Sequence, residues 1–287
     1  MLYKLLYAYA DSFSALNVFK YITVRSFISF FMAFVLCVVL GPWFIRLIKS
    51  KQFEQSIRDD GPESHKKKSG TPTMGGGLML LSILLPVLMW VDLANKLVLG
   101  SIIILVTFAL VGAWDDALKI LKKNSKGLSG RFRLVIEFAV TTSVIWYLTH
   151  SGHIDTNIYV PFLKNVVIDF GWVYVPFAAF IIVGCANAIN LTDGLDGLAI
   201  VPIVICVLTF ALFSYLGGHF ELAEYLKIPF IKGAGELVPL SAAVVAAGLG
   251  FLWFNAYPAQ IFMGDIGSLS LGSFVGVLAV LSKNELL

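Results

Sequence analysis

Long apolar runs alternate with short polar segments along the whole chain. A helix needs about 20 mostly apolar residues to cross the hydrocarbon core of a bilayer. Eight stretches reach that length or come near it, at residues 25–48, 74–91, 97–114, 132–149, 172–189, 198–216, 238–256 and 266–282. The pattern therefore predicts an all-α polytopic membrane protein with about eight transmembrane helices.

The composition agrees with that fold class. Hydrophobic residues make up 58% of the chain and charged residues 14%, and the mean hydropathy is +0.86. These values exclude an ordinary soluble domain. The formal net charge of +3 is too small to suggest a nucleic-acid partner. The three cysteines lie in apolar stretches without paired spacing, so we expect small buried side chains rather than a disulfide or a metal site.

Basic residues concentrate in alternate loops. Thirteen Lys and Arg lie in the two loops at 46–68 and 119–133, whereas the loops expected on the other side hold four. By the positive-inside rule, the basic loops are cytoplasmic and the N-terminus lies outside. Every unusual polar motif then faces the cytoplasm. On the outer side, alternating β-branched and aromatic residues at 157–173 predict a small hairpin.

Polar side chains gather between the fifth and sixth apolar stretches. Asn187, Asn190, Asp193 and Asp196 follow one another at a spacing of three. If this segment is helical, each step turns by about 60°, and the four side chains cover roughly half of the helix surface. An ionisable residue beside a membrane span is costly and therefore indicates a functional site. The alternative, a turn in which Asp193 caps the next helix, explains only one of the two acids.

Other acids lie at the ends of apolar stretches. Asp115 and Asp116 follow the third stretch, where adjacent acids at a helix C-terminus oppose the macrodipole and require a cation or a nearby Lys. The loop at 119–133 either clamps a phosphate or only satisfies the charge rule. Asp265 precedes the last stretch, where it is either functional or an N-cap. Phe262 suits either base stacking or the membrane interface.

The first basic loop leads into a glycine-rich segment. A basic run ending at Lys68 is followed by Pro72, Thr73 and three consecutive glycines at 75–77. Proline and glycine there favour a helix start whose N–H groups are open to an anion. Lys68 and Thr73 are therefore candidates for phosphate binding. The alternative is a charge run that only touches anionic lipid.

The five acids lie on one side of the predicted membrane, with basic loops beside them and no His or Cys cluster. Oxygen ligands of this kind suit Mg²⁺ or Mn²⁺, and Mg²⁺ commonly binds one or two carboxylates together with substrate phosphates. The residues therefore predict a hard-cation site with a di- or polyphosphate substrate. The membrane setting predicts a lipid as the second substrate.

Several motifs resemble those of a known family. Residues 114–116, 190–199 and 262–268 resemble the signatures of the polyprenyl-phosphate N-acetylhexosamine-1-phosphate transferases. Residues 63–65, 70–76 and 257–260 resemble the branch that transfers phospho-N-acetylmuramoyl-pentapeptide in peptidoglycan synthesis. The resemblance extends over residues 1–287, so it implies a single integral membrane transferase domain.

The resemblance implies a reaction between UDP-N-acetylmuramoyl-pentapeptide and undecaprenyl phosphate. The products are the lipid-linked diphosphate sugar and UMP, the cofactor is Mg²⁺, and the site faces the cytoplasm at the bacterial inner membrane. The implied catalytic residues are Asp115 and Asp116, near the lipid phosphate, and Asp265, a metal ligand. A homodimer is compatible with the sequence, which leaves the oligomeric state open.

The remaining candidates concern substrate binding. Asn190, Asp193 and Asp196 would line the nucleotide and metal pocket, with Asp193 as a second metal ligand. Asn255 and Phe262 would lie near uracil. The substrate-binding set is Lys68, Thr73, Arg133, Asn187, Asn190, Asp193, Asp196, Asn255 and Phe262. Within it, the charge of Arg133 fits a diphosphate contact.

The chemistry of the lipid substrate limits the mechanism. A phosphate monoester has a second pKa of about 6, so at neutral pH it attacks the β-phosphorus without a strong base. We therefore favour direct attack over a covalent aspartyl intermediate, with Asp115 or Asp116 orienting the lipid phosphate or removing a residual proton. Two other functions are an ion-coupled transporter, which favours inverted repeats and mid-membrane acids, and a Mg²⁺-dependent membrane prenyltransferase, whose acid spacing fits poorly.

One departure from the family pattern concerns the C-terminal part. The family usually has ten spanning helices and a His-rich cytoplasmic loop after the ninth. The four histidines here, His65, His150, His153 and His219, do not match that loop, and the sequence stops just past the eighth stretch. We therefore expect that residues 1–287 alone, without these parts, are inactive.

Overall fold

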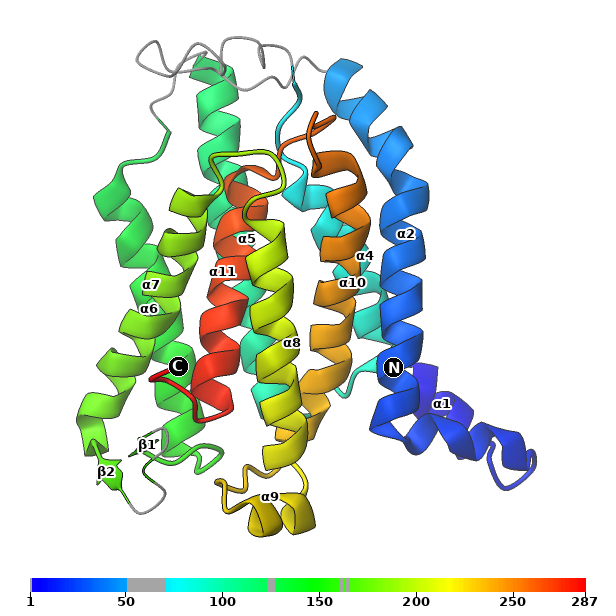
Figure 1. Ribbon diagram of the computed structural model, residues 1–287, viewed down its shortest axis with the longest axis vertical. Coiled ribbons are helices and arrows are strands. Elements are labelled where there is room, and N and C mark those ends of the chain that lie inside the picture. The colour runs from blue at the N-terminus through cyan, green and yellow to red at the C-terminus, as the bar shows by residue number, and fades with distance from the viewer. Residues whose placement is uncertain (1, 51–70, 123–126, 161–162, 164–165) are drawn as a thin grey trace.

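A computed structural model describes residues 2–50, 71–122, 127–160, 163 and 166–287 as a bundle of near-parallel helices (Figure 1). Among the described residues, seven helices are long and apolar enough to cross a membrane, which confirms the predicted fold class. The remaining predicted span, at residues 74–91, is helical but has only 15 residues. The helices are α2 (Ile22–Ser50), α4 (Gly76–Trp90, the short one), α5 (Lys96–Lys122), α6 (Gly130–His150), α7 (Tyr174–Thr192), α8 (Ile200–Gly217), α10 (Leu237–Asn255) and α11 (Gly264–Leu281).

Helix α11 forms the centre of the bundle. Every residue from Ile266 to Leu281 is buried, as expected for a helix that is apolar on all sides. Its main neighbours are α7 and α5, while α10 packs chiefly on α2 and α8. The first turn of α11 lies at the end of the bundle that is uppermost in Figure 1. The surrounding helices therefore place their own ends around that turn.

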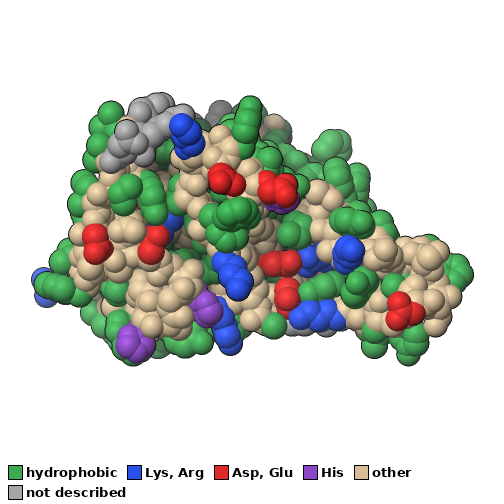
Figure 2. Space-filling view, turned by 90° about the horizontal axis from the view of Figure 1, so that it is seen from below, with side chains coloured by type: hydrophobic (Ala, Val, Ile, Leu, Met, Phe, Trp, Pro, Cys, Tyr) green, Lys and Arg blue, Asp and Glu red, His purple; other side chains and the backbone are tan. Residues whose placement is uncertain are grey.

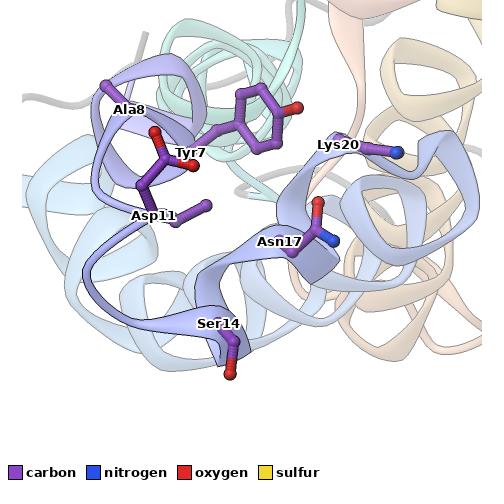
Figure 3. Close-up of a pocket in the computed structure, with 7 residues that line it drawn as sticks. Tyr7, Ala8, Asp11, Ser14, Asn17 and Lys20 are labelled. Atoms are coloured by element: carbon purple, nitrogen blue, oxygen red, sulfur yellow. The ribbon is translucent and has the colours of Figure 1, made fainter.

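Small elements cover the opposite end of the bundle, which Figure 2 views directly. Strands β1 (Asn157–Tyr159) and β2 (Val167–Asp169) form an antiparallel hairpin, as the sequence predicts. The other short helices there are α1 (Leu2–Ala8), α9 (Phe220–Leu226) and three 3-10 helices, at Ser14–Lys20, Gly171–Val173 and Ala234–Glu236. A polar pocket between α1 and the first 3-10 helix is lined by Tyr7, Asp11 and Lys20 among others (Figure 3). It lies far from the acidic motifs.

Two predictions about helix ends are wrong. Helix α5 continues to Lys122, so Asp115 and Asp116 lie within it rather than at its C-terminus, and the macrodipole argument does not apply. Within this continued helix, Lys119 lies one turn after Asp115 and neutralises it. Helix α7 ends at Thr192, so Asp193 and Asp196 do not lie on the same helix as Asn187 and Asn190. Asp193 does not cap α8 either, because the N-cap of α8 is Ala199.

A buried ion pair joins the N-terminal part of the chain to the region before α10. Arg25 on α2 is 2% exposed, and its guanidinium donates to the two carboxylate oxygens of Glu236 at 2.6 and 2.8 Å. A second pair, Lys4 with Asp92, lies close by but is largely exposed. Breaking a buried pair leaves an uncompensated charge, whereas an exposed pair contributes little.

We therefore expect Arg25→Met to lower the free energy of unfolding by about 3–5 kcal/mol. The matched variant Lys4→Met should change it by about 1 kcal/mol or less. Denaturant unfolding of the two variants in detergent, followed by circular dichroism, measures both. Equal effects of the two substitutions would contradict this account of the ion pairs at this end of the bundle.

Candidate active site

The candidate site is built from the first turn of α11 and parts of three neighbouring helices. Asp265 lies in that turn, and Asp115 and Asp116 lie on α5. Asn190 belongs to the last turn of α7. Arg133 lies in the first turn of α6. The bundle thus brings distant parts of the sequence together. Asp265 is 132 residues from Arg133 and 150 residues from Asp115.

A lysine that the sequence analysis did not select lies between two of the acids. The Lys119 ammonium is 2.6 Å from Asp115 Oδ2 and 2.7 Å from Asp265 Oδ2. The other oxygen of Asp265 accepts a hydrogen bond of 2.8 Å from Asn190 Nδ2, which is also 2.7 Å from Ser268 Oγ. Both oxygens of Asp265 are therefore held by charged or amide donors, which favours its ionised form. Asp265 is not the N-cap of α11, which is Met263.

Asp116 supports the start of α11 from the neighbouring helix. Its Oδ2 accepts a hydrogen bond of 3.2 Å from the backbone N–H of Ile266, one of the N–H groups that a helix leaves free in its first turn. The positive end of the helix dipole favours a carboxylate there. Asp115 is likewise buried, and the backbone N–H of Leu128 donates to it at 2.6 Å. Asp115 is 3% exposed and Asp116 is 5% exposed. Each of the two carboxylates therefore accepts a backbone hydrogen bond in a buried position.

Two glycines permit this close approach. A Cβ at Gly112 on α5 would overlap the backbone carbonyl of Asp265, so a side chain there would push α5 away from α11. Gly264 adopts φ +71°, a conformation that strongly favours glycine. A Cβ at Gly264 would lie 2.7 Å from Asp116 Oδ2 and 3.0 Å from Thr73 Oγ1. Thr73 is buried, and the structure places it close to Asp116, while its role as a site residue stays a prediction.

Asn255 and Asp196 connect the loops beside the acidic cluster. The Asn255 side chain is 2% exposed, accepts from the Gly197 N–H at 3.1 Å and donates to the Ile261 carbonyl at 2.9 Å. Asp196 accepts from the Ala259 N–H at 3.2 Å. These contacts join the turn after α7 to the loop before α11. Asn255 therefore shapes this part of the site through backbone contacts.

Phe262 is held in the same region by its backbone. Its N–H donates to the Pro72 carbonyl and its carbonyl accepts from the Gly75 N–H, each at 2.8 Å. The loop before α11 is thereby paired with the segment that precedes α4. This pairing brings Thr73 and Phe262 to one region, although 189 residues separate them in sequence. Lys68 lies outside the described residues.

A second charged group adjoins Asp265. Arg133 Nη2 donates to Asn187 Oδ1 at 2.7 Å, and its Nη1 is 3.9 Å from Asp265 Oδ2. Asn187 Nδ2 in turn donates to Glu137 Oε2 at 2.9 Å. The sequence analysis missed Glu137 as well as Lys119. The available signal was spacing, since each lies four residues after a selected charged residue and so shares its helix face.

Negative charge remains in excess around Asp193. Burial and the charges of Asp265 and Asp116 raise the pKa of the half-buried Asp193 to about 8. No group of three His, Cys, Asp or Glu side chains in the described part of the chain is arranged to hold a metal ion. Such a group is not required for Mg²⁺, which commonly takes one or two carboxylates plus substrate phosphates. The oxygen donors and the surplus charge are therefore suited to a hard cation.

Comparison with known proteins places the chain in a family. The profile described as glycosyl transferase family 4 matches residues 98–283, which is more than half of the chain. The chain belongs to glycosyl transferase family 4. Proteins named phospho-N-acetylmuramoyl-pentapeptide-transferase from Citrifermentans bemidjiense, Pelobacter propionicus and Syntrophus aciditrophicus are 48%, 47% and 46% identical to it over 287 residues. Each match covers the whole chain and 80% of the relative.

Membership of glycosyl transferase family 4 confirms the resemblance drawn from the motifs. The matched region contains Asp115, Asp116, Lys119 and Asp265, so the buried cluster belongs to the part that defines the family. The chain is a transferase with membrane-spanning helices. The transporter and prenyltransferase alternatives are therefore set aside.

The close contact at Gly112 gives a direct test of this geometry. We expect Gly112→Ala to lower the transfer rate by about 100-fold, because displacing catalytic groups by about 1 Å has effects of that size. The matched control is Gly184→Ala on α7, where nothing among the described residues lies within 4 Å of the added Cβ. The measurement is the transfer rate in membranes that carry each full-length variant. Equal rates for the two variants would contradict the packing described above.

Proposed function

We propose that the protein transfers phospho-N-acetylmuramoyl-pentapeptide from UDP-N-acetylmuramoyl-pentapeptide to undecaprenyl phosphate, releasing UMP, in peptidoglycan synthesis. The observation that carries this proposal is the 48% identity, over the whole chain, to a protein named for that transfer. The acidic cluster around Asp265 supplies a site with the chemistry such a reaction needs. A homodimer stays a prediction.

The location of the site supports a reaction at the cytoplasmic face of the bacterial inner membrane. The acids lie at one end of the membrane-spanning bundle, where a lipid phosphate at the membrane surface can reach them. The last turns of α2 and α5 and the first turns of α4 and α6 lie at the same end. In the sequence, residues 46–68 and 119–133 hold 13 of the 21 Lys and Arg of the chain. By the positive-inside rule, this end is cytoplasmic.

The reaction proceeds by direct attack of the lipid phosphate on the β-phosphorus of the UDP-sugar. A bond forms between a lipid phosphate oxygen and that phosphorus, and the bond from the phosphorus to the oxygen that bridges the two phosphates breaks, so that UMP leaves. The lipid phosphate is largely a dianion at neutral pH and needs little help from a base. Catalysis then depends on positioning and on charge neutralisation.

The hydrogen bonds of the acids favour direct attack over a covalent aspartyl intermediate. Asp265 is held by Lys119 and Asn190, and Asp116 by the Ile266 N–H. A carboxylate oxygen that accepts such bonds is a weaker nucleophile than a free one. Asp115 or Asp116 orients the lipid phosphate or accepts its residual proton, while Lys119 and Arg133 neutralise phosphate charge.

Mg²⁺ would be held by Asp265 and Asp193. Both offer oxygen ligands, and burial together with the negative charges of Asp265 and Asp116 raises the pKa of Asp193. When bound, the ion supplies neutralisation of the charge on the diphosphate. In this proposal the uracil binds near Asn255 and Phe262. Asp196 and Asn190 line the nucleotide pocket, and Thr73 and Lys68 bind the phosphates.

The sharpest test of this function compares Asp265→Asn with the native protein. We expect UMP release from the UDP-linked substrate to fall by at least about 100-fold in the variant, as when one charge-stabilising group is removed. Chelation of divalent cations should abolish release by the native protein. Membranes carrying the full-length proteins are the material, and Asp169→Asn on the distant hairpin is the matched control.

The control should release UMP at the native rate, because Asp169 lies at the opposite end of the bundle. Release that persists in Asp265→Asn and also under chelation would refute the metal-dependent transferase reaction.

A further inference from the structure

A fully buried carboxylate lies behind the candidate site. Glu137 on α6 is 0% exposed, although α6 is exposed over much of its length. The buried positions of this helix are Glu137, Thr141, Ile145 and Leu148, which form one stripe at helical spacing. The acid lies at the end of the stripe nearest Asp265. A charge among packed helices is costly, so its presence calls for a specific partner.

The partners of Glu137 are two residues of the candidate site. Its Oε2 accepts a hydrogen bond of 2.9 Å from Asn187 Nδ2. Its Oε1 faces Arg133 Nε at 3.5 Å, and neither of these two buried atoms has a hydrogen-bond partner among the described residues. Arg133 Nη2 donates to Asn187 Oδ1 at 2.7 Å. The three side chains therefore contact one another in a closed ring.

The ring has a defined direction. Asn187 Nδ2 donates to the Val183 carbonyl as well as to Glu137, each at 2.9 Å, so the amide oxygen is the atom left to face Arg133. With Nη2 held by that oxygen and Nε facing the carboxylate, the guanidinium can rotate little. Its remaining nitrogen, Nη1, is directed toward Asp265 at 3.9 Å. Glu137 itself is too deeply buried to touch a substrate.

We propose that Glu137 is a positioning residue, which orients the guanidinium of Arg133, directly and through the amide of Asn187, toward the diphosphate of the substrate. This assignment rests on the proposed function. Glu137 acts through Arg133, because its charge restricts the rotation of the guanidinium, and through Asn187, because it accepts one amide hydrogen. The Arg133 guanidinium then meets the transferred phosphate without a reorganisation cost.

The test is a double-mutant cycle between Glu137 and Arg133, measured as UMP release in membranes carrying the full-length protein. Glu137→Gln keeps the size of the side chain and an oxygen for Asn187 but removes the charge that faces Arg133. We expect kcat to fall by about 10- to 100-fold, as for a misplaced catalytic group, with KM for the UDP-linked substrate changing less than about threefold. Glu137→Asp, which keeps the charge, should give an intermediate kcat.

The decisive comparison is made in the Arg133→Met background. If Glu137 acts through Arg133, Glu137→Gln should change kcat there by less than about threefold, because residues that act as a unit are not additive. A merely structural role would give the full loss in both backgrounds. The matched control is Thr141→Val, a substitution of similar shape one turn along the same buried stripe. It should stay within about twofold of the native kcat.

Each outcome has a clear meaning. Additive losses in the cycle, or native kcat in Glu137→Gln, overturn the positioning role while leaving the proposed function intact. Absence of UMP release by the native protein overturns the proposed function and this assignment with it. If Glu137→Gln fails to accumulate in membranes, Glu137→Asp carries the same cycle, and additivity there overturns the assignment.

Discussion

The contact on which the site depends is the Lys119 ammonium between the carboxylates of Asp115 and Asp265. It joins α5 to the first turn of α11 at distances of 2.6 and 2.7 Å, where two acids alone would repel one another. The other groups are arranged around this contact. Asn190 holds the second oxygen of Asp265 from α7, and Asp116 supports the N-terminus of α11 from α5.

The central position of α11 holds these contacting groups in one arrangement. Its fully buried length fixes the helix in the bundle, so its first turn has one position relative to α5 and α7. Gly112 allows the backbones of α5 and α11 to approach closely at that level. Behind these contacts lies the ring of Arg133, Asn187 and Glu137, in which the carboxylate of Glu137 is fully buried and Arg133 is partly exposed. The site is therefore supported from α6 and α7 as well as from α5.

The sequence predicted the membrane spans well because lipid imposes their length and apolar character. All eight predicted stretches are helical, including the short α4, and the hairpin at 157–173 is present. The extension of α5 beyond residue 114 was missed because the apolar run stops at the two acids, whereas the helix continues to Lys122 and Lys119 pairs with Asp115. Apolar periodicity carries no information about such contacts.

The motifs also selected several residues that lie together in the structure, but they did not show which of these residues contact one another. Asp115, Asp116, Asn190 and Asp265 do converge, as their placement on one side of the membrane suggests. Which group neutralises which could not be predicted, since the Lys119 to Asp265 contact spans 146 residues and depends on how α5 packs on α11. Glu137 was overlooked although it lies four residues after Arg133, and its contact with Asn187 depends on how α6 packs on α7.

The most direct test of the central role of Lys119 is UMP release by the Lys119→Met variant. Methionine is of similar length but cannot neutralise Asp115 and Asp265 or a phosphate. Measured beside the native full-length protein at saturating substrates, the variant should lose at least about 100-fold in rate, the effect expected when a preorganised charge is removed. A rate within about twofold of the native one would contradict the account.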